Sequence, residues 1–249
     1  MNNTIRTILN HRSVRHFKST PVPESEMTTI IEAAQAASTS SFLQAYSIIA
    51  VTEKELKQKL AEAAGNQEYV EHNGAFLVFC ADMNRAGKAA DMTEKNIEKS
   101  VSSTEGFMVS IIDAALAAQN AAIAAESSGL GICYIGGIRN DLPAVSEWLD
   151  IPDYVLPLFG MAIGYPESVE DQKPRLPHKA VVHYNRYNND SEAIYKILEK
   201  YDTTIFQYYQ SRSRGRKKLN WTGQITSMLE KGRRLYMNEF VKQKGFIQE

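Results

Sequence analysis

The stretch from Phe107 to Ser128 constrains the fold most, because it is apolar nearly all round and rich in alanine. A helix of this composition packs centrally, and its small side chains let other backbones approach closely. Asp113, Gln119 and Asn120 interrupt the apolar run, which favours a buried helix of a soluble protein over a membrane span. We therefore expect one core built around this helix.

Short apolar runs on both sides of that helix predict a small sheet. Residues 75–81 (AFLVFCA) form a continuous apolar run, as expected of a strand buried on both faces. Further strands are expected at 45–51, 131–138 (the last residues forming a glycine turn) and 158–165, with helices at 4–10, 24–37 and 53–64. The alternation predicts an α+β layered domain whose chain beyond Tyr184 is a polar, helical extension.

Charge and cysteine usage narrow the class of protein. The formal net charge of −1 argues against nucleic acid or an anionic membrane as a partner of the whole molecule. Cys80 and Cys133 each lie in an apolar run, as small buried hydrophobes of a reducing compartment do. The N-terminal residues lack the apolar core of a secretory signal, so a cytoplasmic location is expected.

Four separated segments carry the groups that a flavin nucleotide requires. His11 to Arg15 combines guanidinium groups with a hydroxyl, which suits a phosphate, and Lys173-Pro174-Arg175 holds two cations apart. Ser38 to Ser41 with Gln44 suits a ribityl chain, and Tyr134 to Gly137 ends a strand in glycines that permit close approach to a flat ring. Taken singly, each segment could equally be a solvated basic loop, a polar loop or a tight turn.

Other catalytic patterns are absent from the sequence. It contains no P-loop, no strand–GxGxxG–helix unit, no GxSxG elbow, no HExxH motif and no His/Cys cluster with metal-ligand spacing. A cofactor-driven enzyme needs little side-chain chemistry, because the cofactor carries the reaction.

In combination, these segments resemble the flavin-dependent nitroreductase superfamily, in its NADPH-dependent flavin reductase and oxygen-insensitive nitroreductase branch. The matching elements are HRSVR at 11–15, ASTSSFLQAYSII at 37–49, GNQ at 65–67, FCAD at 79–82, GLGICYIGGIRN at 129–140, and GYP followed by KPR at 164–175. The resemblance spans nearly the whole chain in the right order.

The resemblance implies a three-layer α/β/α sandwich with a small, mostly antiparallel central sheet. Residues 1–184 would form the FMN-binding core with a helical excursion at 84–106, and residues 185–249 a C-terminal extension that wraps the partner and helps recognise NADPH. Two protomers would intertwine as a homodimer with two FMN molecules at the interface, each contacted by both chains. The Ser-rich loop, Ser38 to Ser41 with Gln44, would reach the partner's flavin. No metal is implied.

The resemblance also assigns roles to residues by position. Gly136 would offer its backbone N–H to flavin N5, and Arg15 would lie near the N1/O2 edge of the ring, where a cation stabilises the reduced flavin. The full FMN-binding set is His11, Arg12, Ser13, Arg15, Ser40, Ser41, Gln44, Gln67, Tyr134, Ile135, Gly136, Gly137, Lys173 and Arg175.

The extension of this branch carries an arginine for the 2′-phosphate of NADPH. The spacing YYxxRx₈W is retained, with Arg212 in the arginine position, but the density of cations after it leaves Arg214, Arg216 and Lys217 as further candidates.

The implied activity is a ping-pong cycle. NADPH would stack on the exposed flavin face, hydride would pass to N5, and a nitroaromatic, quinone, free flavin or similar small acceptor would then replace NADP⁺. The physiological acceptor and the preference for NADPH over NADH remain open. Two alternatives are a non-catalytic FMN store or redox sensor, and nucleic-acid binding through the Arg-rich run at 211–218.

Overall fold

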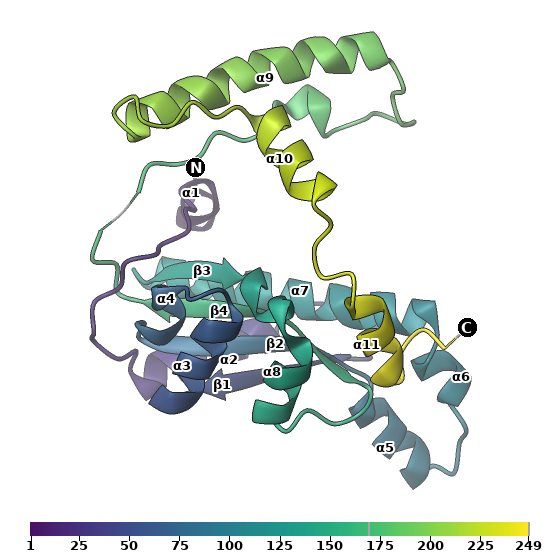
Figure 1. Ribbon diagram of the computed structural model, residues 1–249. Coiled ribbons are helices and arrows are strands. Elements are labelled where there is room, and N and C mark those ends of the chain that lie inside the picture. Colours follow the sequence, from purple (N-terminus) through teal and green to yellow (C-terminus); the bar gives the residue numbers. More distant parts are fainter. Residues whose placement is uncertain (169, 249) are drawn as a thin grey trace. The chain divides into compact units, whose positions relative to one another are not determined.

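The protein forms two compact units in a computed structural model that describes residues 1–168 and 170–248 (Figure 1). The first unit is Met1–Glu170 together with Tyr236–Glu249, and the second is Asp171–Leu235. This division lies near Glu170, whereas the sequence placed the start of the extension at residue 185.

A four-stranded antiparallel sheet forms the centre of the first unit. Its strands are β1 (Tyr46–Val51), β2 (Ala75–Asp82), β3 (Gly131–Ile135) and β4 (Val155–Gly164), in the spatial order β1-β2-β4-β3. All three strand pairs are antiparallel, and the β2–β4 register shifts between Phe79 and Cys80. The expected small antiparallel sheet is confirmed.

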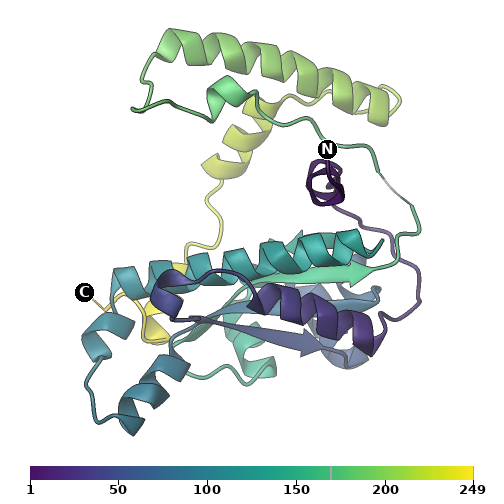
Figure 2. The same cartoon turned by 180° about the vertical axis from the view of Figure 1, so that it is seen from behind.

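Helices cover both faces of this sheet. Leu77 and Phe79 of β2 join the core beneath α2 (Glu24–Gln35) and α7 (Thr104–Ser127), whereas Phe76 and Val78 join the core on the opposite face. That opposite face is covered by α3 (Lys54–Ala63), α4 (Glu68–Glu71) and α8 (Leu142–Trp148), as Figures 1 and 2 show from the two sides. The result is the predicted three-layer α/β/α sandwich.

Helix α7 is the central helix that the sequence predicts. Its alanines Ala114, Ala117, Ala118 and Ala121 are almost fully buried in the core with the sheet, because only small side chains let the helix approach the strands closely. Among the described residues it is the one helix long and apolar enough to cross a membrane by length and composition. The burial of its alanines in the core is typical of the central helix of a folded domain.

Smaller elements complete the first unit. Helix α1 is Asn3–Leu9, one residue earlier than the expected 4–10, and is capped by Asn2, whose side chain accepts from the Ile5 backbone N–H. The 84–106 excursion contains α5 (Asn84–Met92) and α6 (Glu98–Val101), and the C-terminal helix is α11 (Met237–Gln243). In the described part of the chain, 3-10 turns lie at η1 (Ser40–Phe42), η2 (Gly136–Asn140) and η3 (His178–Ala180), the last in the second unit.

The C-terminal residues belong to the first unit. The hydroxyl of Tyr236 accepts from the Leu142 backbone N–H and donates to the Arg139 carbonyl, both at 2.8 Å. Phe246 is fully buried and its ring lies 5.0 Å from that of Phe107, centroid to centroid. These contacts make the end of the chain part of the core.

The second unit is a pair of helices, α9 (Ser191–Arg212) and α10 (Trp221–Glu230). Asp202 of α9 accepts from the backbone N–H groups of Trp221 and Thr222, each at 2.9 Å, and so satisfies the N-terminus of α10. Tyr201 is buried and donates to the Pro174 carbonyl at 2.9 Å, which ties the 173–175 segment to α9.

Candidate functional site

The segment His11 to Arg15 runs beside strand β3. The Val14 N–H donates to the Ile132 carbonyl at 2.9 Å, and Ser13 forms a parallel bridge with Ile132. Val14 is buried against Gly131, where an added Cβ would lie 2.5 Å from a Val14 methyl group, so only glycine allows this approach. The backbone pairing fixes this segment at the edge of the sheet.

Two predicted site residues converge beside Cys133 of β3. Burial raises the pKa of the Cys133 thiol, while the positive charge of Arg15 and a hydrogen bond with Ser13 oppose that rise. Burial also raises the pKa of Tyr69 of α4, and the neighbouring Arg15 guanidinium opposes that rise. Arg15 therefore lies near both Cys133 of β3 and Tyr69 of α4, with its side chain exposed to solvent.

His11 and Arg12 are each anchored as well. His11 Nδ1 lies 2.7 Å from a carboxylate oxygen of Glu126 at the end of α7, which favours the tautomer with hydrogen on Nδ1. Arg12 donates from Nε to the Asn10 carbonyl at 2.9 Å. Arg12 lines an open pocket of about 420 Å³ together with Arg6, Asn10, Glu126 and Gly131.

The glycine turn after β3 lies next to the 65–67 turn. An added Cβ at Gly137 would lie 2.6 Å from the Ala64 carbonyl oxygen, so the two turns are in direct contact. Gln67 ends that turn and is the N-cap residue of α4, without a capping hydrogen bond from its side chain. Ile135 is buried, Gly136 is half-buried, and Tyr134 is exposed with its hydroxyl 3.4 Å from Gln119.

These residues fit the polar part of a flavin nucleotide. The donors of Arg12, Ser13 and Arg15 are gathered within one short segment fixed along a strand, and guanidinium and hydroxyl groups are the donors that phosphate and ribityl oxygens need. Half-burial of His11, Arg12 and Ser13 leaves them open to a ligand. The described residues contain no group of three His, Cys, Asp or Glu side chains placed to hold a metal ion.

The Ser-rich loop occupies another part of the same unit. Ser40, Ser41 and Gln44 are exposed, and the loop is tied to α7 through Asp113, whereas the His11 segment is tied to α7 through Glu126. At 1.5 Å per helical residue, these two anchors stand about 20 Å apart along the helix axis. Within one chain, therefore, the structure does not bring the loop to the His11 segment.

The remaining predicted residues belong to the second unit. Lys173 donates to the Tyr209 hydroxyl at 2.9 Å and its ammonium lies 5.2 Å from the centre of that ring, while Arg175 is exposed. Arg212 is the last residue of α9 and donates to the Tyr208 hydroxyl at 3.1 Å. The other basic candidates, Arg214, Arg216 and Lys217, follow in the exposed loop after the helix.

Three residues around the site were not predicted from the sequence. Tyr69 lies beside Arg15, and Asp113 and Arg85 hold the Ser-rich loop. Asp113 had a recognisable signal, because a carboxylate within an apolar, alanine-rich helix needs a buried partner. Tyr69 and Arg85 gave none, since both partnerships depend on tertiary contacts.

Family models and a relative of known name match nearly the whole chain. The nitroreductase family model matches residues 8–165, and the model of the nitroreductase family C-terminal domain matches residues 173–249. The FMN reductase (NADPH) of Bacillus subtilis is 52% identical over 246 residues, covering 99% of each chain.

Solved structures are similar over the same length. The NfrA1 nitroreductase of B. subtilis superposes with a TM-score of 0.97 at 51% identity, covering 99% of this chain and 100% of that one. The NADPH:FMN oxidoreductase of Vibrio harveyi, solved with NAD⁺, has a TM-score of 0.89 at 39% identity and full coverage of both chains. The chain belongs to the nitroreductase family.

Proposed function

We propose that this protein is an FMN-dependent NADPH oxidoreductase that passes electrons to nitroaromatics, quinones, free flavin or similar small acceptors. The observation that carries the proposal is the pairing of His11–Arg15 with β3, which presents guanidinium and hydroxyl donors beside a glycine-ended strand. The close relatives support it, because they are named as an FMN reductase that uses NADPH and as NADPH-dependent oxidoreductases.

FMN, when bound, supplies the two-electron redox chemistry, and the protein supplies binding, orientation and charge. Arg12 and Ser13 hold phosphate and ribityl oxygens, with Lys173 and Arg175 assigned to the same part of the nucleotide. Arg15, which lies beside Tyr69, places a positive charge where negative charge develops on the reduced ring. Gly136 offers a backbone N–H at the end of β3, while Tyr134, Ile135 and Gly137 shape that wall.

NADPH recognition is assigned to the second unit. Arg212 binds the 2′-phosphate, because it ends an ordered helix and its guanidinium is already oriented by Tyr208. Arg214, Arg216 and Lys217 follow it in sequence and add positive charge to the same region.

We further propose that the protein acts as a cytoplasmic homodimer. The Ser-rich loop and the His11 segment are anchored to α7 at points about 20 Å apart. One flavin can therefore contact both only if the loop comes from a second chain. Helix α7 exposes Met108, Ile112 and Leu116 at four-residue intervals, and the loop exposes Phe42, which suits an apolar interface with another copy. In the dimer, Ser40, Ser41 and Gln44 contact the partner's FMN and Gln67 that of its own chain.

The deciding experiment is an absorbance spectrum of the purified protein, before and after anaerobic addition of NADPH. The proposal predicts flavin bands that bleach with NADPH and return when a nitroaromatic or quinone is added. FMN that binds but is not reduced by NADPH would favour a flavin store or redox sensor. A protein that takes up no FMN would refute the proposed function.

A further inference from the structure

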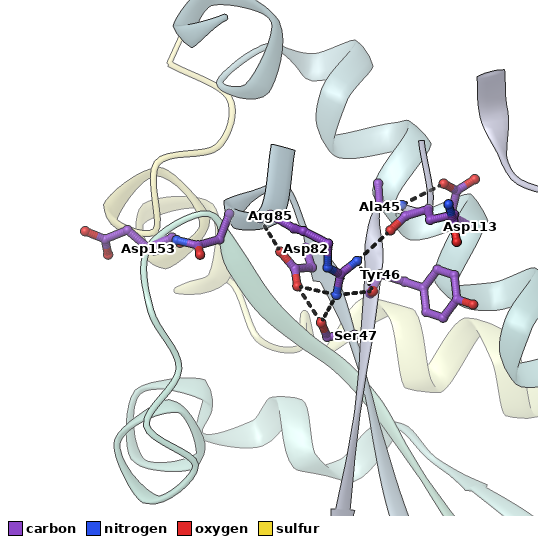
Figure 3. A network of polar contacts seen from close by, with 9 residues as sticks. Ala45, Tyr46, Ser47, Asp82, Arg85, Asp113 and Asp153 are labelled. Atoms are coloured by element: carbon purple, nitrogen blue, oxygen red, sulfur yellow. Dashed lines mark hydrogen bonds and ion pairs between the residues drawn. The ribbon is translucent and has the colours of Figure 1, made fainter. Parts of the chain in front are cut away.

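Asp113 is a buried carboxylate in the middle of α7 with no exposed surface. One of its oxygens accepts from the Ser40 backbone N–H and the other from the Ala45 backbone N–H, both at 3.0 Å. Figure 3 shows the hydrogen bond between the Ala45 backbone N–H and Asp113. A single carboxylate therefore joins the two ends of the Ser-rich loop.

The loop between these ends has an unfavourable backbone. Ser41, Phe42 and Gln44 have φ values of 48°, 60° and 55°, in the left-handed region that residues with a side chain rarely adopt. Several such residues in so short a segment persist only where the surroundings hold them. The side chains of the loop are exposed and give it little packing of their own.

Arg85 of α5 is a second tie on the same loop. Its Nη1 donates to the carbonyls of Gln44 at 3.0 Å and Tyr46 at 3.2 Å. Its Nη2 donates to Ser47 at 2.9 Å and lies 3.4 Å from a carboxylate oxygen of Asp82, as Figure 3 shows. Asp113 thus holds the N–H groups at the ends of the loop, and Arg85 holds carbonyls at its exit into β1.

We propose that Asp113 is a positioning residue that sets the 40–45 loop in its FMN-binding conformation before the flavin arrives, with Arg85 as the second tie. The inference rests on the proposed function, in which Ser40, Ser41 and Gln44 contact FMN. Asp113 is too deeply buried to contact a ligand itself, so it acts through the two backbone N–H groups. A loop ordered during folding saves the conformational entropy that binding would otherwise cost.

The test compares Asp113→Asn with the wild type in two measurements. The asparagine amide keeps one acceptor oxygen but turns an NH₂ group toward the second backbone N–H, so one end of the loop is released. In the FMN-free protein, we expect amide hydrogen exchange at residues 40–45 to be at least about tenfold faster. We expect the Kd for FMN to rise by about tenfold or more, since a hydrogen bond to a charged group is lost.

Two further variants separate positioning from general stability. Asn120→Ala removes a hydrogen bond from the same helix to the Ala33 carbonyl, outside the loop, and should leave both the loop exchange and the Kd at wild-type values. Arg85→Ala alters an exposed side chain and should fold normally while raising the Kd for FMN, which keeps the idea testable if Asp113→Asn does not fold.

The outcomes distinguish the two proposals. A wild-type protein that takes up no FMN refutes the proposed function and, with it, the role of the loop in flavin binding. A wild type that binds FMN, beside Asp113→Asn and Arg85→Ala variants of unchanged affinity, overturns only the positioning role. Unchanged amide exchange at residues 40–45 in Asp113→Asn also overturns it.

Discussion

At the scale of single residues, the site depends on a few cations whose orientation is set by aromatic hydroxyls. Lys173 donates to the Tyr209 hydroxyl and Arg212 to the Tyr208 hydroxyl, and Arg15 lies beside Tyr69. A guanidinium or ammonium that is already oriented loses less side-chain entropy when an anion binds. Removing the cation should therefore affect the bound nucleotide more than the stability of the fold.

Arg212→Ala is expected to raise the KM for NADPH by about tenfold or more and to change the KM for NADH little. A charge-assisted hydrogen bond to the 2′-phosphate contributes about 1.5–3 kcal/mol, and NADH lacks that group. Steady-state kinetics with both dinucleotides measure the difference, and Lys196→Ala, which removes an exposed cation elsewhere on α9, is the matched control. An equal loss with NADH and NADPH would remove Arg212 from 2′-phosphate recognition.

Arg15→Ala is expected to weaken FMN binding by about tenfold and to lower the flavin reduction potential, because the cation stabilises the reduced form. Equilibrium titration with FMN and a reductive titration against a dye of known potential measure the two effects. Lys18→Ala removes an exposed cation from the same segment and should change neither. Wild-type affinity and potential in Arg15→Ala would place Arg15 outside the site.

At the scale of elements, the glycine turn after β3 is locked against the 65–67 turn. Gly137→Ala would bring a methyl group 2.6 Å from the Ala64 carbonyl, and such overpacking costs about 1–3 kcal/mol. Gly87→Ala is the control, because Gly87 lies within α5 with no atom within 4 Å, and it should stabilise by up to about 1 kcal/mol. Urea unfolding measures both, and a Gly137→Ala variant as stable as the wild type would contradict the contact.

Elements with a strong local pattern could be predicted from the sequence, and elements defined by tertiary contacts could not. The central helix and the strand at 75–81 were predicted within a few residues, because composition and apolar continuity determine them. The helices α4 and α8 were missed, since each is short and has little periodicity of its own. The same contrast holds at the site, where HRSVR is visible as a motif but its pairing with β3 is not.

The Ser-rich loop shows why a motif alone does not describe a site. Its hydroxyls were visible in the sequence, but its left-handed residues and its hydrogen bonds to the Asp113 carboxylate were not. Asp113 lies 68 residues from Ala45 along the chain, so no local pattern connects the two. The family resemblance assigned the loop its role, and the structure adds how its shape is maintained.

At the scale of the whole molecule, the proposed dimer predicts that association and flavin binding are lost together. Ile112 is 51% exposed on α7, between Met108 and Leu116 on the same face. Ile112→Glu would place a charge in the apolar interface, where an unpaired charge is strongly unfavourable. We expect this variant to be monomeric in sedimentation or light scattering and to bind FMN much more weakly.

Met92→Glu, which changes an apolar residue exposed at the end of α5, should remain dimeric. A wild-type protein that binds FMN tightly as a monomer would contradict the argument, since one chain does not bring the loop to the His11 segment.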